Sequence, residues 1–357
     1  MPSLSDLPPE VLDHVLFFLL PVVSFSTLPT RLEILRGLAL VSKTFRRITR
    51  RELFRVVSLV DDEQAVRFLE TARANKAVDY VQNLYIDCTC ASDDGAFLYD
   101  ILEACRRVRR LRVTSDDFDL AALDGLRDLR VLDLDSTIAT LSRPITLPSL
   151  VEFSSSYSVA YDEYQTAFFT PASLPSLRIV ALRHGPEDSP AFPSTDLAIA
   201  DYFFPSAAIR PHLDLVSHND IHLLSLIPPT AVTIFCVTFQ DPDNPFPALS
   251  QALSTSPFAI RLLEQYPDLP RTNQHYELPA IRRQLVDFIL NVLPPSPERI
   301  LPILILPPLL PEEINPVPSM NNPPSYPGQV VYADEDALVF PHFRRWADAH
   351  RAAKELQ

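Results

Sequence analysis

The stretch Leu129-Arg130-Val131-Leu132-Asp133-Leu134 places apolar residues in the frame apolar-x-x-apolar-x-apolar. Its second half alternates apolar and polar residues, and alternate residues of a strand point to opposite faces of a sheet. The pattern therefore predicts a short strand centred on Leu132, with one face buried.

The same frame recurs along the chain. Its central positions, Leu84, Leu111, Leu132, Phe153 and Val180, are 27, 21, 21 and 27 residues apart. Longer and shorter steps of 33 and 21 residues continue it less clearly to Leu213 and Ile234. A recurrence of this length is typical of a solenoid in which each unit supplies one strand, and the alternative is an ordinary α/β domain with evenly spaced strands.

The segments between these strands have helical spacing. Asp61 to Asn75 predicts a capped helix, and helical turns are expected around Phe97 to Leu102 and Leu120 to Leu126. Further on, Phe258 to Tyr266 and Pro279 to Leu293 predict helices, and Arg299 to Leu306 predicts a late strand. Pro294 to Pro327 contains 12 prolines, and its part from Pro307 to Pro327 predicts an extended loop or a partly disordered linker.

Near the N-terminus, Leu7-Pro8-Pro9-Glu10-Val11-Leu12 is followed by a second motif at 40–48, Leu-Val-Ser-Lys-Thr-Phe-Arg-Arg-Ile. The first motif opens a predicted helix with Leu12, Val15, Leu16 and Leu19 on one stripe. A second helix is expected from Thr30, and a third carries Val41, Phe45 and Ile48 on one face. Three short helices cannot bury this much apolar surface among themselves, so they require a partner.

These two motifs resemble the F-box, the three-helix module that docks onto the Skp-family adaptor of cullin-RING ubiquitin ligases. The resemblance covers roughly residues 3 to 55, with Phe45 where the family often has Trp and a long interval between Leu19 and Val41. It implies that apolar residues bind the adaptor, with Glu10 and Lys43 as polar contacts at the rim. The implied adaptor-binding residues are Leu7, Pro8, Glu10, Val11, Leu12, Val15, Leu16, Leu40, Val41, Lys43 and Phe45.

The repeated strands resemble irregular leucine-rich repeats, although Asp135 and Ser136 or Ser155 and Ser156 stand where that family usually has Asn. A recurring layout in which an F-box precedes such repeats implies that the solenoid holds a protein substrate. The exposed face of the predicted sheet mixes charged, hydroxyl and aromatic groups, as a binding surface or a solvated sheet would. The candidate substrate face comprises Tyr85, Asp87, Arg110, Arg112, Asp133, Asp135, Glu152 and Arg183.

The predicted fold class is therefore α/β: a three-helix F-box at 1–57, an irregular leucine-rich-repeat-like solenoid at 58–293, a Pro-rich segment at 294–333 and a C-terminal helix at 334–357. The implied function is that of a non-enzymatic substrate adaptor of an SCF-type ligase, whose partners are the Skp-family adaptor, a cullin and an unidentified protein substrate. No cofactor is expected. An F-box scaffold acting outside a ligase is the first alternative.

The composition of the chain limits the classes of ligand and the cellular locations that are expected. A net charge of −14 argues against nucleic acid as the main ligand. The arginine run 106–112 is the one basic candidate, and nearby aspartates, including Asp116, Asp117, Asp133 and Asp135, favour a self-neutralised face. Four cysteines predict buried thiols of a reducing compartment. With no signal peptide or membrane span indicated, a cytoplasmic or nuclear location is expected.

Catalytic motifs are scarce in the sequence. With only five glycines, the chain lacks phosphate-cradling and nucleophile-elbow patterns. His218 and His222 have the i, i+4 spacing of zinc ligands on a helix, and His212 is a possible third ligand. A metal-dependent hydrolase built on an α/β scaffold is therefore the second alternative, although capping at a helix start explains the same stretch.

Overall fold

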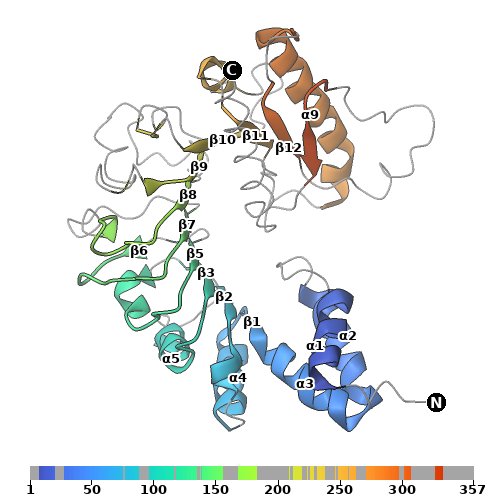
Figure 1. The fold of residues 1–357 in the computed structure, drawn as a ribbon, viewed down its shortest axis with the longest axis vertical. Helices are drawn as coiled ribbons and strands as arrows, with labels where there is room; N and C mark the ends of the chain where they lie inside the picture. The colour runs from blue at the N-terminus through green and yellow to red at the C-terminus, as the bar shows by residue number, and fades with distance from the viewer. Residues whose placement is uncertain are drawn as a thin grey trace. The chain divides into compact units, whose positions relative to one another are not determined.

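The computed structural model describes residues 8–20, 28–74, 77–87, 96–115, 118–134, 137, 139–155, 168–182, 209, 212–218, 223, 226–228, 231–237, 246, 248–255, 257–262, 271–296, 301–306 and 326–332. Within these residues the protein is α/β, with seven α-helices and a large parallel sheet (Figure 1). The chain divides into two compact units, Met1–His212 and Leu213–Gln357. The boundary expected after residue 57 therefore lies inside the first unit.

The first unit begins with three helices, α1 (Pro9–Leu19), α2 (Leu28–Val41) and α3 (Lys43–Arg55), which we call the helical module. Pro8 occupies the N-cap of α1, and a proline at the first helical position sacrifices no intrahelical hydrogen bond. Helix α3 is capped by Ser42, whose side chain accepts a hydrogen bond from the Phe45 N–H at 3.2 Å. Helix α2 begins before the expected Thr30.

All three helices contribute to one core. Its buried members are apolar side chains, spaced at three or four residues at the α1 end and on α3, with one from α2: Leu12, Leu16, Leu20, Leu35, Phe45 and Ile48. A largely buried ion pair between Arg31 Nη2 and Glu52 Oε2, 3.0 Å apart, joins α2 to α3. These buried side chains and this ion pair hold the three helices of the module together.

Six strands of the first unit lie side by side in the order of the sequence, all parallel: β1 (Val56–Leu59), β2 (Asn83–Asp87), β3 (Arg110–Thr114), β5 (Val131–Leu134), β7 (Glu152–Ser155) and β8 (Ile179–Leu182). Their register pairs Leu84 with Leu111, and Leu111 with Leu132, and continues to Phe153 and Val180. These are the central residues of the sequence frame, so its strands and their register are as predicted. Strand β1 was not predicted.

The same hydrogen bonds recur where each strand begins. The carbonyl of Gln82 accepts from the N–H groups of Arg109 and Arg110 at 2.8 and 3.0 Å. The carbonyl of Arg109 accepts in the same way from residues 130 and 131, that of Arg130 from 151 and 152, and that of Val151 from 178 and 179. Because the bonds are identical across steps of 21 and 27 residues, these positions are structurally equivalent.

The segments that connect the strands cover one face of this sheet. They contain α4 (Asp62–Ala74), the 3₁₀ helix η2 (Val78–Tyr80), α5 (Ala96–Ala104) and the 3₁₀ helix η3 (Leu120–Leu123), and a two-stranded sheet pairs β4 (Phe118–Asp119) with β6 (Ala139–Thr140). Helices α4 and α5 lie together on one side of the ladder of strands (Figure 1). Leu98, Ile101 and Leu102 of α5 are buried, as their helical spacing predicted.

The second unit contains five parallel strands in chain order, β9 (Leu215–His218), β10 (Val232–Val237), β11 (Ala259–Leu262), β12 (Ile303–Leu306) and β13 (Val330–Tyr332). Helices α8 (Leu249–Ser254) and α9 (Arg271–Val292) accompany them. Leu285 and Ile289 of α9 pack in a buried cluster with residues of β10, β11 and β12. The late strand and the helix near residues 279–293 are therefore present.

This unit differs from the sequence analysis in three places. Residues 259–262 form a strand instead of a helix; all four are buried and pair with β10, and three of them also pair with β12. Strand β13 follows the expected loop, which ends at Pro327, and was not predicted. The register places Ser217, not Leu213, opposite Ile234. The expected C-terminal helix at 334–357 lies outside the described residues.

Candidate functional site

The helical module exposes large apolar side chains in two places. On the outer side of α1, Val11 and Phe18 are separated by seven residues, which is two helical turns, and Leu19 is exposed beside them. At the end of α2, Leu40 and Val41 are 80% and 68% exposed. Solvent-exposed apolar side chains of this size concentrated on one small module are typical of a protein-binding surface.

Three of the residues predicted to bind the adaptor lie elsewhere. Leu12, Leu16 and Phe45 are at most 2% exposed, because each packs in the core shared by the three helices. They hold the module together and are not exposed on its surface. Phe18, which is 76% exposed, was not among the predicted residues, although its spacing from Val11 could have indicated it.

The remaining predicted residues of the module are placed as follows. Pro8 and Lys43 are exposed and Val15 is half-buried. Glu10 lies in α1, where only its backbone is described, and Leu7 lies outside the described residues. The exposed members of the predicted set are therefore Pro8, Val11, Leu40, Val41 and Lys43.

The second candidate surface is the face of the first unit's sheet opposite the connecting helices. The register aligns its side chains in two rows, Asn83–Arg110–Val131–Glu152–Ile179 and Tyr85–Arg112–Asp133–Ser154–Ala181. Arg112 Nε lies 3.7 Å from Asp133 Oδ2 on the adjacent strand. Arg110, Asp87 and both members of this pair are partly exposed, while Asp135 and Arg183 lie outside the described residues.

Two residues of this face are not accessible as expected. Tyr85 is buried because it packs with Val56 and with Leu32 of the helical module. Glu152 is 7% exposed, and its burial raises the pKa of the carboxyl to about 7, with Asp133 adding to the rise and Arg110 opposing it. A carboxyl group in this environment stays protonated at pH values between about 4.5 and 7, where surface carboxylates are charged.

The arginine run at 106–112 is partly neutralised, as expected, but mostly by acidic residues other than the predicted aspartates. Arg106 pairs with Glu103 and Arg107 with Asp79, each at 3.8 Å. Arg112 pairs with Asp133, the one predicted aspartate that lies within the described residues. The acids at 79 and 103 precede the run, and their proximity depends on how the chain turns before each strand.

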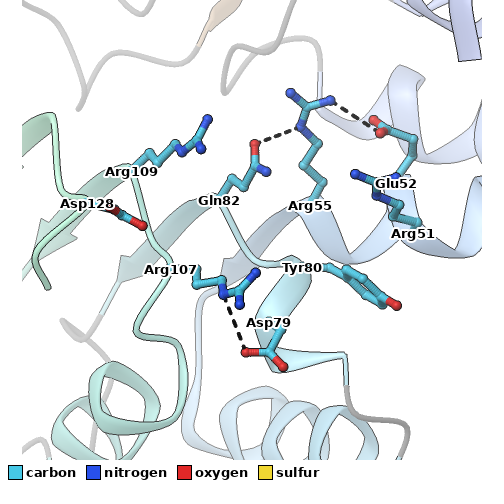
Figure 2. Close-up of a pocket in the computed structure, with 9 residues that line it drawn as sticks. All are labelled: Arg51, Glu52, Arg55, Asp79, Tyr80, Gln82, Arg107, Arg109 and Asp128. Carbon is cyan, nitrogen blue, oxygen red and sulfur yellow. Dashed lines mark hydrogen bonds and ion pairs between the residues drawn. The ribbon is translucent and has the colours of Figure 1, made fainter.

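Two arginines of this run line a cleft with a volume of about 320 Å³ (Figure 2). Helix α3, η2 and the residues preceding β2, β3 and β5 form it. Its lining consists of Arg51, Glu52, Arg55, Asp79, Tyr80, Gln82, Arg107, Arg109 and Asp128. All of these residues belong to the first unit.

The histidine site expected of a metal enzyme does not form as the spacing suggested. His218 ends strand β9 and is buried with its ring against Phe235, so it is not on a helix. His222 lies outside the described residues. In the part of the chain that the structure covers, no group of three or more His, Cys, Asp or Glu residues could hold a metal ion.

The cysteines and the helices add two further observations. Cys105 and Cys236 are buried free thiols, and burial raises the pKa of Cys105 to about 12. Cys88 and Cys90 lie outside the described residues.

None of the described helices combines the length and apolar character that crossing a bilayer requires.

Comparisons of the chain with protein-family models, with curated proteins and with solved structures find no match. The case for a function therefore depends on the motifs and on the geometry of these surfaces.

Proposed function

We propose that this chain is a substrate-recognition adaptor of an SCF-type ubiquitin ligase. The helical module would be an F-box that binds a Skp-family adaptor, and the parallel repeats would be a leucine-rich-repeat-like solenoid that binds a protein target. Such an adaptor contributes no catalytic residue, because holding the target close to the transfer machinery is sufficient.

The observation that carries the proposal is the exposed apolar surface of the module. Phe18, Leu40 and Val41 each leave more than two thirds of their surface in solvent, while other apolar side chains of the module form its buried core. Burying a large apolar side chain contributes about 1.5 to 3 kcal/mol, so a few such residues are enough to carry an interface. Leu40 and Val41 also belong to the second of the two motifs that resemble the F-box.

The recurring backbone hydrogen bonds support the second half of the proposal. A unit that adds one strand beside the preceding one, by the same bonds at each step, is the arrangement expected of a solenoid. The partly exposed polar side chains of the sheet, including the Arg112–Asp133 pair, are the residues offered to a target. An unidentified protein is the partner this surface suits.

The test is co-purification of the full chain with a Skp-family adaptor and a cullin. A Leu40→Asp, Val41→Asp double variant introduces charge at two exposed positions and is expected to weaken adaptor binding at least tenfold while leaving the melting temperature unchanged. Val66→Asp is the matched control, since Val66 is also exposed, on α4, and should bind as the wild type does.

A second control distinguishes a loss of adaptor binding from a loss of stability of the module. Leu16→Ala should lower the free energy of unfolding by about 2 to 5 kcal/mol, because Leu16 is buried within the module. If the wild-type chain captures no adaptor, or if the Leu40→Asp, Val41→Asp variant binds as tightly as wild type, the proposal is wrong. Capture of the adaptor without the cullin would favour the scaffold alternative.

A further inference from the structure

We propose that the cleft between α3 and the first strands binds a phosphate-bearing anion. This inference does not depend on the proposed function, because the cleft lies apart from the exposed apolar residues of α1 and α2. It uses side chains that neither motif of the sequence includes.

The cleft is held open by bonds within its walls. Arg55 Nε donates to Gln82 Oε1 at 3.1 Å, and Arg55 Nη1 lies 3.3 Å from Glu52 Oε1 (Figure 2). On the other side, Arg107 Nε lies 3.8 Å from Asp79 Oδ1. The two bonds of Arg55 therefore arrange one wall before any ligand arrives, whereas the exposed Arg107–Asp79 pair constrains the other wall less.

Two lining arginines remain available. Within the described residues, neither Arg51 nor Arg109 has a hydrogen bond or an ion pair to another side chain, and both are exposed. They come from opposite walls, Arg51 from α3 and Arg109 from the residue preceding β3. Among the three acids of the lining, Glu52 and Asp79 already pair with arginines.

The repeat itself places arginines along this edge of the sheet. Arg55, Gln82, Arg109 and Arg130 occupy equivalent positions, since each carbonyl accepts from the N–H of the next residue in this series. Adjacent strands of a sheet are about 4.8 Å apart, so side chains at equivalent positions follow one another at that interval. Three of the four positions carry a guanidinium group.

The resulting charge favours an anion. Four arginines and three carboxylates give the lining a net charge of +1, in a chain whose total is −14. A guanidinium presents a planar fork of donors that matches phosphate oxygens, and a phosphate offers enough acceptors to engage more than one arginine. The remaining acid, Asp128, has no ion pair among the described residues and opposes anion binding.

The experiment is isothermal titration calorimetry on the full chain at low salt with two probes, pyrophosphate and a phosphoserine peptide beside its unphosphorylated form. Arg109→Ala and Arg51→Ala are each expected to weaken binding roughly tenfold, because each removes charge-assisted hydrogen bonds. Arg109→Lys keeps the charge but loses the fork, so its effect should be intermediate. Asp128→Asn should tighten binding roughly twofold to fivefold by removing an opposing charge.

The control is Arg67→Ala, which removes an exposed arginine of α4 outside the cleft and should leave binding unchanged. Binding of pyrophosphate alone would identify a free phosphate as the ligand, and binding of the phosphopeptide alone a modified protein; either supports the site. If wild type binds neither probe, or if Arg67→Ala weakens binding as much as Arg109→Ala, the cleft is not an anion site. A weaker Asp128→Asn variant would contradict the role given to its carboxylate.

Discussion

Replacing Glu152 with glutamine should make the protein more stable at pH 8 and leave its stability unchanged at pH 4. Glu152 is buried on β7, and its pKa rises from 4.5 to about 7 in the folded chain, chiefly because burial disfavours the charged form. A raised pKa means that the folded state binds the proton more tightly than the unfolded state does. The associated stability is present below pH 4.5 and is lost as the pH rises through about 7.

The shift converts to about 3 kcal/mol, since one pKa unit corresponds to about 1.4 kcal/mol. Urea denaturation followed by circular dichroism between pH 4 and pH 8 gives the free energy of unfolding of Glu152→Gln and of wild type. The contributions of the other titrating groups cancel in the difference between the two proteins. The Glu70→Gln variant, altered at an exposed carboxyl of α4, is the control and should follow the wild type. A difference that stays flat with pH, or a wild type more stable than Glu152→Gln at pH 8, would refute the reasoning by showing that Arg110 compensates for burial.

Three further predictions concern side chains that hold the backbone by hydrogen bonds. Ser42→Ala removes the cap of α3, where the hydroxyl accepts from the Phe45 N–H, and should cost about 1 kcal/mol in urea denaturation; an unchanged midpoint would show that the cap contributes nothing. Thr137→Val removes a fully buried hydroxyl that donates to the Val113 carbonyl at 2.8 Å and accepts from the Ser115 N–H at 3.1 Å, so calorimetry should show a loss of about 1 to 3 kcal/mol that Thr137→Ser does not reproduce. Tyr326→Phe removes the donor to the Pro302 carbonyl at 2.7 Å and should cost about 1 kcal/mol, and equal hydrogen-exchange protection of β12 in the two proteins would contradict this.

The repeated strands could be predicted because the central position of each strand must be occupied by an apolar side chain. Leu84, Leu111 and Leu132 all point into the layer of connecting segments, where only an apolar side chain is stable, so the spacing of such residues gave the register directly. The same reasoning gave the wrong register at β9, where the polar residue Ser217 is buried opposite Ile234. An apolar frame cannot identify the central position of a strand when the residue there is polar.

Other features depend on packing that no local pattern records. Residues 259–262 are buried on both faces, Arg261 included, and a short segment without alternation of exposed and buried residues does not distinguish a strand from a helix. Tyr85 alternates correctly to the open face of its strand, but Leu32, over fifty residues earlier, covers it. The cleft gathers Arg51, Asp79 and Arg109 from three segments, and their proximity follows from the register of the strands.

The carbonyls that precede the strands make the same hydrogen bonds whatever the length of the segment that connects two strands. The geometry of the sheet therefore does not depend on that length. From Gln82 to Arg109 the chain takes 27 residues and forms the nine-residue helix α5, whereas from Arg109 to Arg130 it takes 21 and forms the two-residue strand β4 and the single turn η3. Both routes end in the same pair of hydrogen bonds. Insertions and deletions between strands can therefore accumulate on the outer side during evolution, while the inner ladder and any surface it presents keep their spacing.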